Sequence, residues 1–159
     1  MNQKEHNNSI LIYNYVEKRI QEVNEGLYKT SQKLATIIGF VSILLKFVSE
    51  TSSCYPSLLL TKSISIICLM GSLYYCINGL LPNPTGGTIK SQELVEDWWY
   101  KSDEETKLFI IRQWIKAINE MYDLYNKKTY YVKRAIIFIA LSSLLFGINI
   151  LLVNYFPCS

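Results

Sequence analysis

The stretch AIIFIALSSLLFGINILLVNYF, residues 135–156, decides the fold class because it contains no charged residue. An α-helix rises about 1.5 Å per residue, so about 20 apolar residues cross the roughly 30 Å hydrocarbon core of a bilayer. The strongest polar interruptions are Asn149 and Asn154. The stretch therefore predicts either a membrane span or the buried helix of a soluble bundle, and the rest of the chain separates the two.

Two further apolar stretches precede this one. Residues 57–81, SLLLTKSISIICLMGSLYYCINGLL, are interrupted only by Lys62 and Asn78, and residues 34–49, LATIIGFVSILLKFVS, carry Lys46 near their end. The stretch 34–49 is short for a span, but beside two longer ones it predicts a third span, in a hairpin with 57–81 across ETSSCYPS. We therefore predict three transmembrane helices, with the lipid bilayer as the surroundings of the protein.

The basic residues give an independent test of this topology. Three spans place residues 1–33 and 82–134 on one side of the membrane, and these two segments contain all but two of the 16 lysines and arginines. Basic residues are retained on the cytoplasmic side. The sequence thus predicts a cytoplasmic N-terminus, a C-terminus outside, and spans rather than soluble helices.

Two amphipathic helices are predicted on the cytoplasmic side. Residues 9–33, with Ser9 as N-cap, run into the first span, and their apolar residues follow helical spacing. Residues 91–134 begin with a short helix capped by Ser91, and Ser102 with Glu105 fits a capping box before a longer helix that runs into the third span. The first apolar stripe is Ile12, Val16, Ile20, Val23, Leu27 and Leu34, and the second is Leu108, Ile111, Ile115, Ile118, Tyr122 and Tyr125.

These elements predict an all-α integral membrane protein. It has three transmembrane helices, two long cytoplasmic amphipathic helices continuous with the first and third spans, and a single membrane domain over residues 1–159. The two apolar stripes are predicted to pack against each other, because water would not tolerate so much contiguous apolar surface.

Catalytic and cofactor signals are few in this sequence. The single histidine is His6, near the N-terminus, and the TGG at residues 85–87 fits a turn better than a phosphate-binding loop. The four cysteines lack the paired spacing of zinc ligands. The net charge of +3 is too balanced to indicate a nucleic-acid partner. We predict no enzyme, no cofactor and no metal.

The tryptophans Trp98, Trp99 and Trp114 have two interpretations. They could contact a flat ligand at the cytoplasmic helices, or they could pack between helices and near lipid headgroups. The sequence favours packing.

Polar residues inside the predicted spans form a second candidate set. Lys46 and Lys62 either extend toward water at the outer boundary or line a pore in a homo-oligomer. Asn78 and Asn149 are predicted to make interhelical hydrogen bonds, and Gly39 and Gly71 to permit close helix approach. Because three helices hide only part of these groups, we expect a homo-oligomer.

The predicted topology also places Cys54 and Cys158 together on the outer side. They either form a disulfide in an oxidising compartment or remain two free thiols. Cys68 and Cys76 lie within the second span, where thiols behave as small apolar groups.

The order of these parts resembles a family of small bacterial membrane effectors, the Pycsar-type effector transmembrane proteins and the related SLATT-type effectors. The matching pieces are SQKLATIIGF (31–40), LLP (80–82) and KAINEMYDLYNKKTYYVKRAIIF (116–138). Of the family's Asp-x-Lys-Ala opening only Lys33 is present, with Ser31 and Leu34 at the Asp and Ala positions.

The resemblance implies a function in bacterial anti-phage defence at the inner (plasma) membrane. An oligomer would perturb that membrane when a nucleotide second messenger or a soluble partner acts at the cytoplasmic helices. The alternative is a non-enzymatic membrane scaffold whose cytoplasmic helices recruit a soluble partner.

Overall fold

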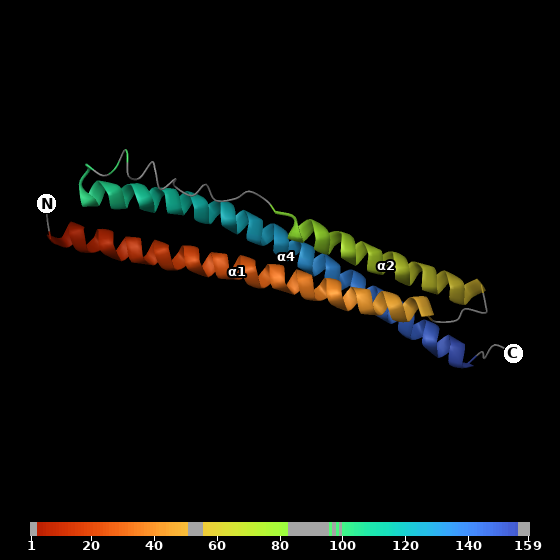
Figure 1. The fold of residues 1–159 in the computed structure, drawn as a ribbon. Helices are drawn as coiled ribbons and strands as arrows, with labels where there is room; N and C mark the ends of the chain where they lie inside the picture. The colour runs from red at the N-terminus through yellow and green to blue at the C-terminus, as the bar shows by residue number, and fades with distance from the viewer. Residues whose placement is uncertain (1–2, 51–55, 83–95, 97, 99, 156–159) are drawn as a thin grey trace. The chain divides into compact units, whose positions relative to one another are not determined.

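The computed structural model describes residues 3–50, 56–82, 96, 98 and 100–155. Three long helices run through these residues, α1 (Gln3–Glu50), α2 (Pro56–Leu80) and α4 (Asp103–Tyr155), and none of the described residues lies in a strand (Figure 1). All three are long and apolar enough to cross a membrane. The predictions of an all-α fold and of three helices able to span a bilayer are confirmed.

The helix boundaries follow local chemistry. α1 crosses the predicted junction at residues 33 and 34 without a break, but it begins at Gln3, so the prediction that Ser9 caps it is wrong. Gln3, Lys4 and Glu5 favour helix, and no proline or glycine stops α1 from extending past Ser9. α2 begins at Pro56, whose fixed φ suits a first helical position, and it ends two residues before Pro82.

α4 begins where the sequence predicted a cap. The hydroxyl Oγ of Ser102 accepts a hydrogen bond from the backbone N–H of Glu105 at 3.3 Å, which confirms the Ser102 cap. The helix then continues without a break to Tyr155. Of the predicted segment 91–134, the part that includes Ser91 lies outside the described residues.

The chain divides into two compact units, whereas the sequence predicted one membrane domain over residues 1–159. We call Met1–Lys29 with Pro82–Asn126 the helix-pair unit, and Thr30–Leu81 with Lys127–Ser159 the three-helix unit. α1 and α4 contribute residues to both units, and α2 belongs to the three-helix unit alone.

The core of the helix-pair unit joins the two predicted apolar stripes. Val16 and Val23 of α1 are buried with Ile111 and Ile118 of α4, which confirms that the stripes pack together. Ile12, Leu108 and Ile115 are 48%, 50% and 46% exposed, so their assignment to the buried stripes is wrong. The packed face of α4 instead includes Trp114 and Met121, which lie three or four residues from Ile111 and Ile118. Ile115 therefore lies at the edge of this face. The residues packed around this core are Tyr13, Ile20, Trp114, Met121 and Tyr122.

The three-helix unit has two buried clusters. Leu34, Cys76 and Ala135 come from α1, α2 and α4 respectively, so all three helices meet at this level. The second cluster contains Val41, Val48 and Leu69. Large apolar side chains also cover the outside of all three helices, among them Phe40, Ile43, Phe47, Leu59, Leu60, Ile67, Met70, Ile136, Ile137, Leu144 and Leu151. Apolar surface of this extent suits contact with lipid.

Candidate functional site

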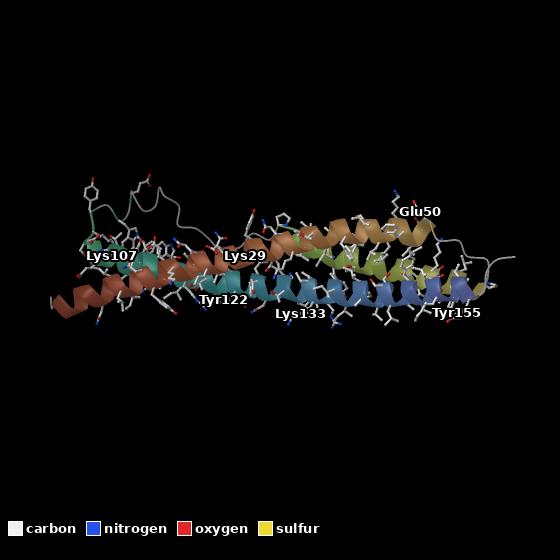
Figure 2. The ribbon with its side chains drawn as sticks, turned by 90° about the horizontal axis from the view of Figure 1, so that it is seen from below. Lys29, Glu50, Lys107, Tyr122, Lys133 and Tyr155 are labelled. Carbon is white, nitrogen blue, oxygen red and sulfur yellow. The ribbon has the colours of Figure 1, made fainter. Side chains whose placement is uncertain are left out.

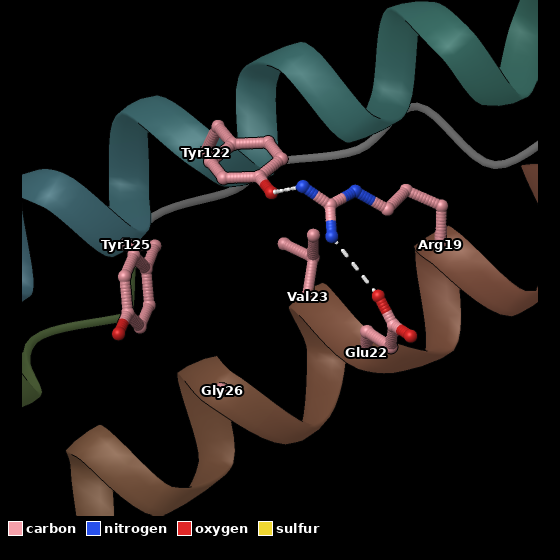
Figure 3. A pocket seen from close by; sticks show the side chains of 6 residues that line it. All are labelled: Arg19, Glu22, Val23, Gly26, Tyr122 and Tyr125. Atoms are coloured by element: carbon pink, nitrogen blue, oxygen red, sulfur yellow. Dashed lines mark hydrogen bonds and ion pairs between the residues drawn. The ribbon is translucent and has the colours of Figure 1, made fainter.

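A hollow of about 200 Å³ lies between α1 and α4 in the helix-pair unit. Figure 3 shows the four residues of α1 and the two tyrosines of α4 that surround it. The lining residues are Arg19, Glu22, Val23, Gly26, Tyr122 and Tyr125.

Arg19 carries the polar contacts of this hollow. Its guanidinium donates one hydrogen bond to the carboxylate of Glu22 at 3.0 Å and another to the hydroxyl of Tyr122 (Figure 3). It also lies 5.3 Å from the centre of the Tyr122 ring. The hydrogen bond to Glu22 raises the pKa of Arg19 above its already high ordinary value. Arg19 therefore stays charged at physiological pH and bridges α1 to α4.

Gly26 allows the ring of Tyr125 to approach α1 closely at the edge of this hollow. A Cβ atom at this position would meet Cε2 of Tyr125 at 3.3 Å, so the ring occupies the place of a side chain on α1. Pockets for drug-sized ligands usually measure about 300–1,000 Å³. The hollow is smaller, and it would not enclose a whole nucleotide.

Sequence reasoning placed Val23, Tyr122 and Tyr125 in the packed stripes, but it did not single out Arg19, Glu22 or Gly26 as lining a hollow. Arg19 borders the first stripe, three residues after Val16 and four before Val23, and Glu22 is exposed, and charged residues are ordinary at both kinds of position. Nothing in the sequence aligns Gly26 with Tyr125, which lies 99 positions further along the chain.

Of the predicted tryptophans that the structure describes, neither Trp98 nor Trp114 lines the hollow. The Trp98 ring stacks on Phe109 with 4.1 Å between centroids, and Nζ of Lys101 lies 4.1 Å from the Trp98 ring centre. Trp114 packs on Tyr13 at 5.0 Å beside the buried core. These three contacts fit the packing interpretation, and Trp99 lies outside the described residues.

Lys62 has a specific contact in the three-helix unit. Its ammonium donates a hydrogen bond to the backbone carbonyl of Ser49 at 2.9 Å. The last carbonyls of a helix lack partners within the helix and carry partial negative charge. Lys62 of α2 therefore caps the C-terminal end of α1 across the hairpin, a role that sequence spacing alone did not indicate.

Lys46 is exposed, and its ammonium lies 4.0 Å from the carboxylate of Glu50 in the last turn of α1. Both side chains are largely accessible, so this ion pair contributes little to stability.

The two predicted asparagines behave differently. The amide of Asn149, only 2% exposed, donates to the carbonyl of Leu58 and to the hydroxyl of Thr61, each at 3.1 Å. The amide of Asn78 donates to the Tyr74 carbonyl of its own helix at 2.8 Å. Asn149 thus bonds α4 to α2 inside one protomer. Its burial removes one of the reasons for expecting a homo-oligomer.

A serine pair that sequence reasoning missed also joins α2 to α4. The hydroxyls of Ser65 and Ser142 lie 2.7 Å apart, and each is within hydrogen-bond distance of the backbone carbonyl of the other.

Close approach occurs at Gly71, where an added Cβ would meet Phe138 at 3.3 Å, while Gly39 has open space around it. The prediction of close approach is confirmed at Gly71, and Gly39 makes no such approach to the described residues.

Ser142→Ala is expected to lower the free energy of unfolding by about 0.6 kcal/mol, and by at most about 1.7 kcal/mol, the range for hydrogen bonds between membrane helices. Unfolding of the full chain in a denaturing detergent, followed by circular dichroism, measures the change. Ser143→Ala is the matched control because Ser143 is exposed on the same helix. Equal stability of the two variants would contradict a contribution from the serine pair.

The remaining predicted sites are two cysteines. Cys54 and Cys158 lie outside the described residues, and Cys68 and Cys76 of α2 carry free thiols. Within the described part of the chain, His, Cys, Asp and Glu side chains form no group of three that could hold a metal ion.

Together, the helices and their contacts are compatible with a multi-pass α-helical membrane protein that has a second, helix-pair unit. Comparison with known proteins found no matching family model, no similar curated protein and no similar solved structure.

Proposed function

We propose that this chain is a non-enzymatic membrane effector. In this proposal, the helix-pair unit on the cytoplasmic side receives a signal, and the three-helix unit perturbs the bacterial inner membrane as part of a homo-oligomer. The setting in anti-phage defence rests on the resemblance of residues 31–40, 80–82 and 116–138 to the effector families.

The observation that carries the proposal is the continuity of α1 and α4. Each helix has one part in the helix-pair unit and another in the three-helix unit. A signal that changes the pairing of the two helices therefore has a covalent path to the three-helix unit. A continuous helix is one physical route by which a change at one site can reach another.

The Arg19–Tyr122 contact is the element on which such a signal would act. It is a polar bond between α1 and α4 beside the apolar core of the helix-pair unit, and it borders the space beside Gly26. A soluble partner or a small ligand that competes for Arg19 would weaken the pair. The size of the hollow favours a partner surface over an enclosed nucleotide.

A membrane scaffold is the second candidate function. It is favoured by the polar groups of the three-helix unit, because Ser65, Ser142, Asn149 and Lys62 all bond within one chain. These groups need no pore and no neighbouring subunit.

In the effector proposal, Lys46 and Lys62 would supply basic groups near one end of the pore.

Induced expression in bacteria loaded with a membrane-potential dye tests the proposal. Tyr122→Phe removes the hydroxyl that accepts the Arg19 bond, so this variant should dissipate the potential at lower expression than the unaltered protein. Tyr28→Phe is the matched control, because Tyr28 is exposed on α1.

One outcome contradicts the effector function, and another contradicts its gating. Normal potential at high expression of membrane-inserted protein, with and without phage infection, would leave the scaffold as the function. Identical expression thresholds for the two variants would contradict gating through Arg19 and Tyr122.

A further inference from the structure

The three-helix unit has an uneven charge distribution. Residues 30–81 and 127–159 contain one acidic residue, Glu50, and seven basic residues. Two of the basic residues, Lys46 and Lys62, are near Glu50 at the hairpin. The other five we call the basic collar: Lys33, Lys127, Lys128, Lys133 and Arg134.

Contacts between α1 and α4 place the collar at one level of the three-helix unit. Nζ of Lys128 donates to the hydroxyl of Ser31 at 2.9 Å. Leu34 of α1, directly after Lys33, shares a buried cluster with Ala135 of α4, directly after Arg134. The collar residues of both helices therefore lie at the same end of the three-helix unit. Lys133 is exposed there, as Figure 2 shows.

Tyrosines accompany the collar. Nε of Arg134 donates to the hydroxyl of Tyr130 at 3.1 Å, and the guanidinium lies 5.2 Å from the centre of the same ring. Tyr130 in turn contacts Tyr131 with ring centres 6.0 Å apart, and Tyr131 contacts Tyr75 of α2 at 6.3 Å. Tyrosine is enriched at the headgroup level of membranes, where its ring meets lipid and its hydroxyl meets water.

The Arg134 geometry suits a phosphate group. The bond to Tyr130 uses Nε and fixes the plane of the guanidinium, while the two terminal NH₂ groups can donate to two oxygens of one phosphate. Lys127 and Lys133, both exposed, add positive charge a few residues away on the same helix.

We propose that the basic collar binds the headgroups of anionic phospholipids. Charge complementarity selects these lipids because this end of the three-helix unit is basic. Phosphodiester headgroups without an amine carry net negative charge. Each lysine or arginine near an anionic membrane surface strengthens binding about fivefold. The proposal rests on membrane insertion and stands apart from the effector function.

Native mass spectrometry of the full chain in neutral detergent tests the proposal. Phosphatidylglycerol and phosphatidylcholine with the same acyl chains are titrated separately. The unaltered protein is expected to bind phosphatidylglycerol about tenfold or more tightly than phosphatidylcholine. Removing two collar charges in Lys133→Gln/Arg134→Gln should weaken phosphatidylglycerol binding by about tenfold or more, with phosphatidylcholine binding unchanged.

The matched control is Lys18→Gln/Lys116→Gln, which removes the same charge from exposed positions of the helix-pair unit. Equal affinity of the unaltered protein for the two lipids would overturn the proposal, and this comparison needs no variant to fold. An equal loss in the control variant would mean general charge attraction and would also overturn it. Displacement of the lipid by an equal concentration of glycerol phosphate would assign the collar to a soluble anion instead.

Discussion

Ile118→Asp is expected to lower the free energy of unfolding of the helix-pair unit by about 3 kcal/mol or more. Ile118 is 8% exposed and packs in the core with Val16, Val23 and Ile111. The substitution removes the burial of a large apolar side chain, which contributes about 1.5–3 kcal/mol. It also places a carboxylate among apolar groups, and its neighbours one turn away on α4 are Trp114, Ile115, Met121 and Tyr122, none of which is basic.

Asn119→Asp is the control for this substitution. It adds the same charge at the next position, which is exposed. Hydrogen–deuterium exchange of the full chain in lipid nanodiscs measures the effect, because local opening of α4 between residues 103 and 126 reports the stability of this unit. Faster exchange in Ile118→Asp alone is the expected result. Equal protection in the two variants would contradict the pairing of the stripes.

The sequence was sufficient for the main elements of the fold because these depend on local patterns. Uncharged runs such as residues 135–156 are long enough for a bilayer whatever surrounds them. The helical spacing of Val16 and Val23 predicted a buried face, and Ser102 predicted a cap, since each depends on residues within a few turns. The start of α1 was missed because a polar N-terminal segment such as residues 3–8 has the composition of both an exposed helix and an irregular tail.

The contacts of the candidate sites depend on the register between helices, which the sequence does not contain. Successive helical residues differ by about 100° around the axis, so a small rotation of α4 would separate Ser142 from Ser65. Lys62 was predicted to extend toward water or to line a pore, and its contact with the Ser49 carbonyl depends on how the hairpin closes. The hollow beside Gly26 has the same origin, because it requires Tyr125 to lie opposite that glycine.

The basic collar depends partly on local sequence and partly on the register between helices. Four of its five residues lie within 127–134, so their positive charge is evident from the sequence and helped to predict the orientation in the membrane. The contribution of Lys33 to the same level became visible only through Ser31, Lys128 and the cluster of Leu34 with Ala135. Arg134 acquires a fixed plane through Tyr130, one turn earlier on the same helix.

Gly79→Val is expected to destabilise the three-helix unit by about 1–3 kcal/mol, the usual cost of overpacking a core. A Cβ at position 79 would lie 2.7 Å from Cδ1 of Leu34 and 3.2 Å from Cβ of Tyr131. Leu34 is 0% exposed and has little room to turn away. The Cβ of Tyr131 is fixed to the backbone of α4, so only a shift of a whole helix relieves this contact.

Gly39→Val provides the matched control because an added Cβ at position 39 meets none of the described residues within 4 Å. The same residue change in two apolar helices carries a similar intrinsic effect on helix stability, so the difference between the variants isolates the packing cost. Unfolding of the full chain in a denaturing detergent, followed by circular dichroism, measures that difference. A clear loss of stability in Gly79→Val alone would establish that α2 packs against α1 and α4 through Gly79, because only that packing brings Leu34 and Tyr131 to the same glycine. Equal stability of the two valine variants would show that the three helices do not meet at this residue.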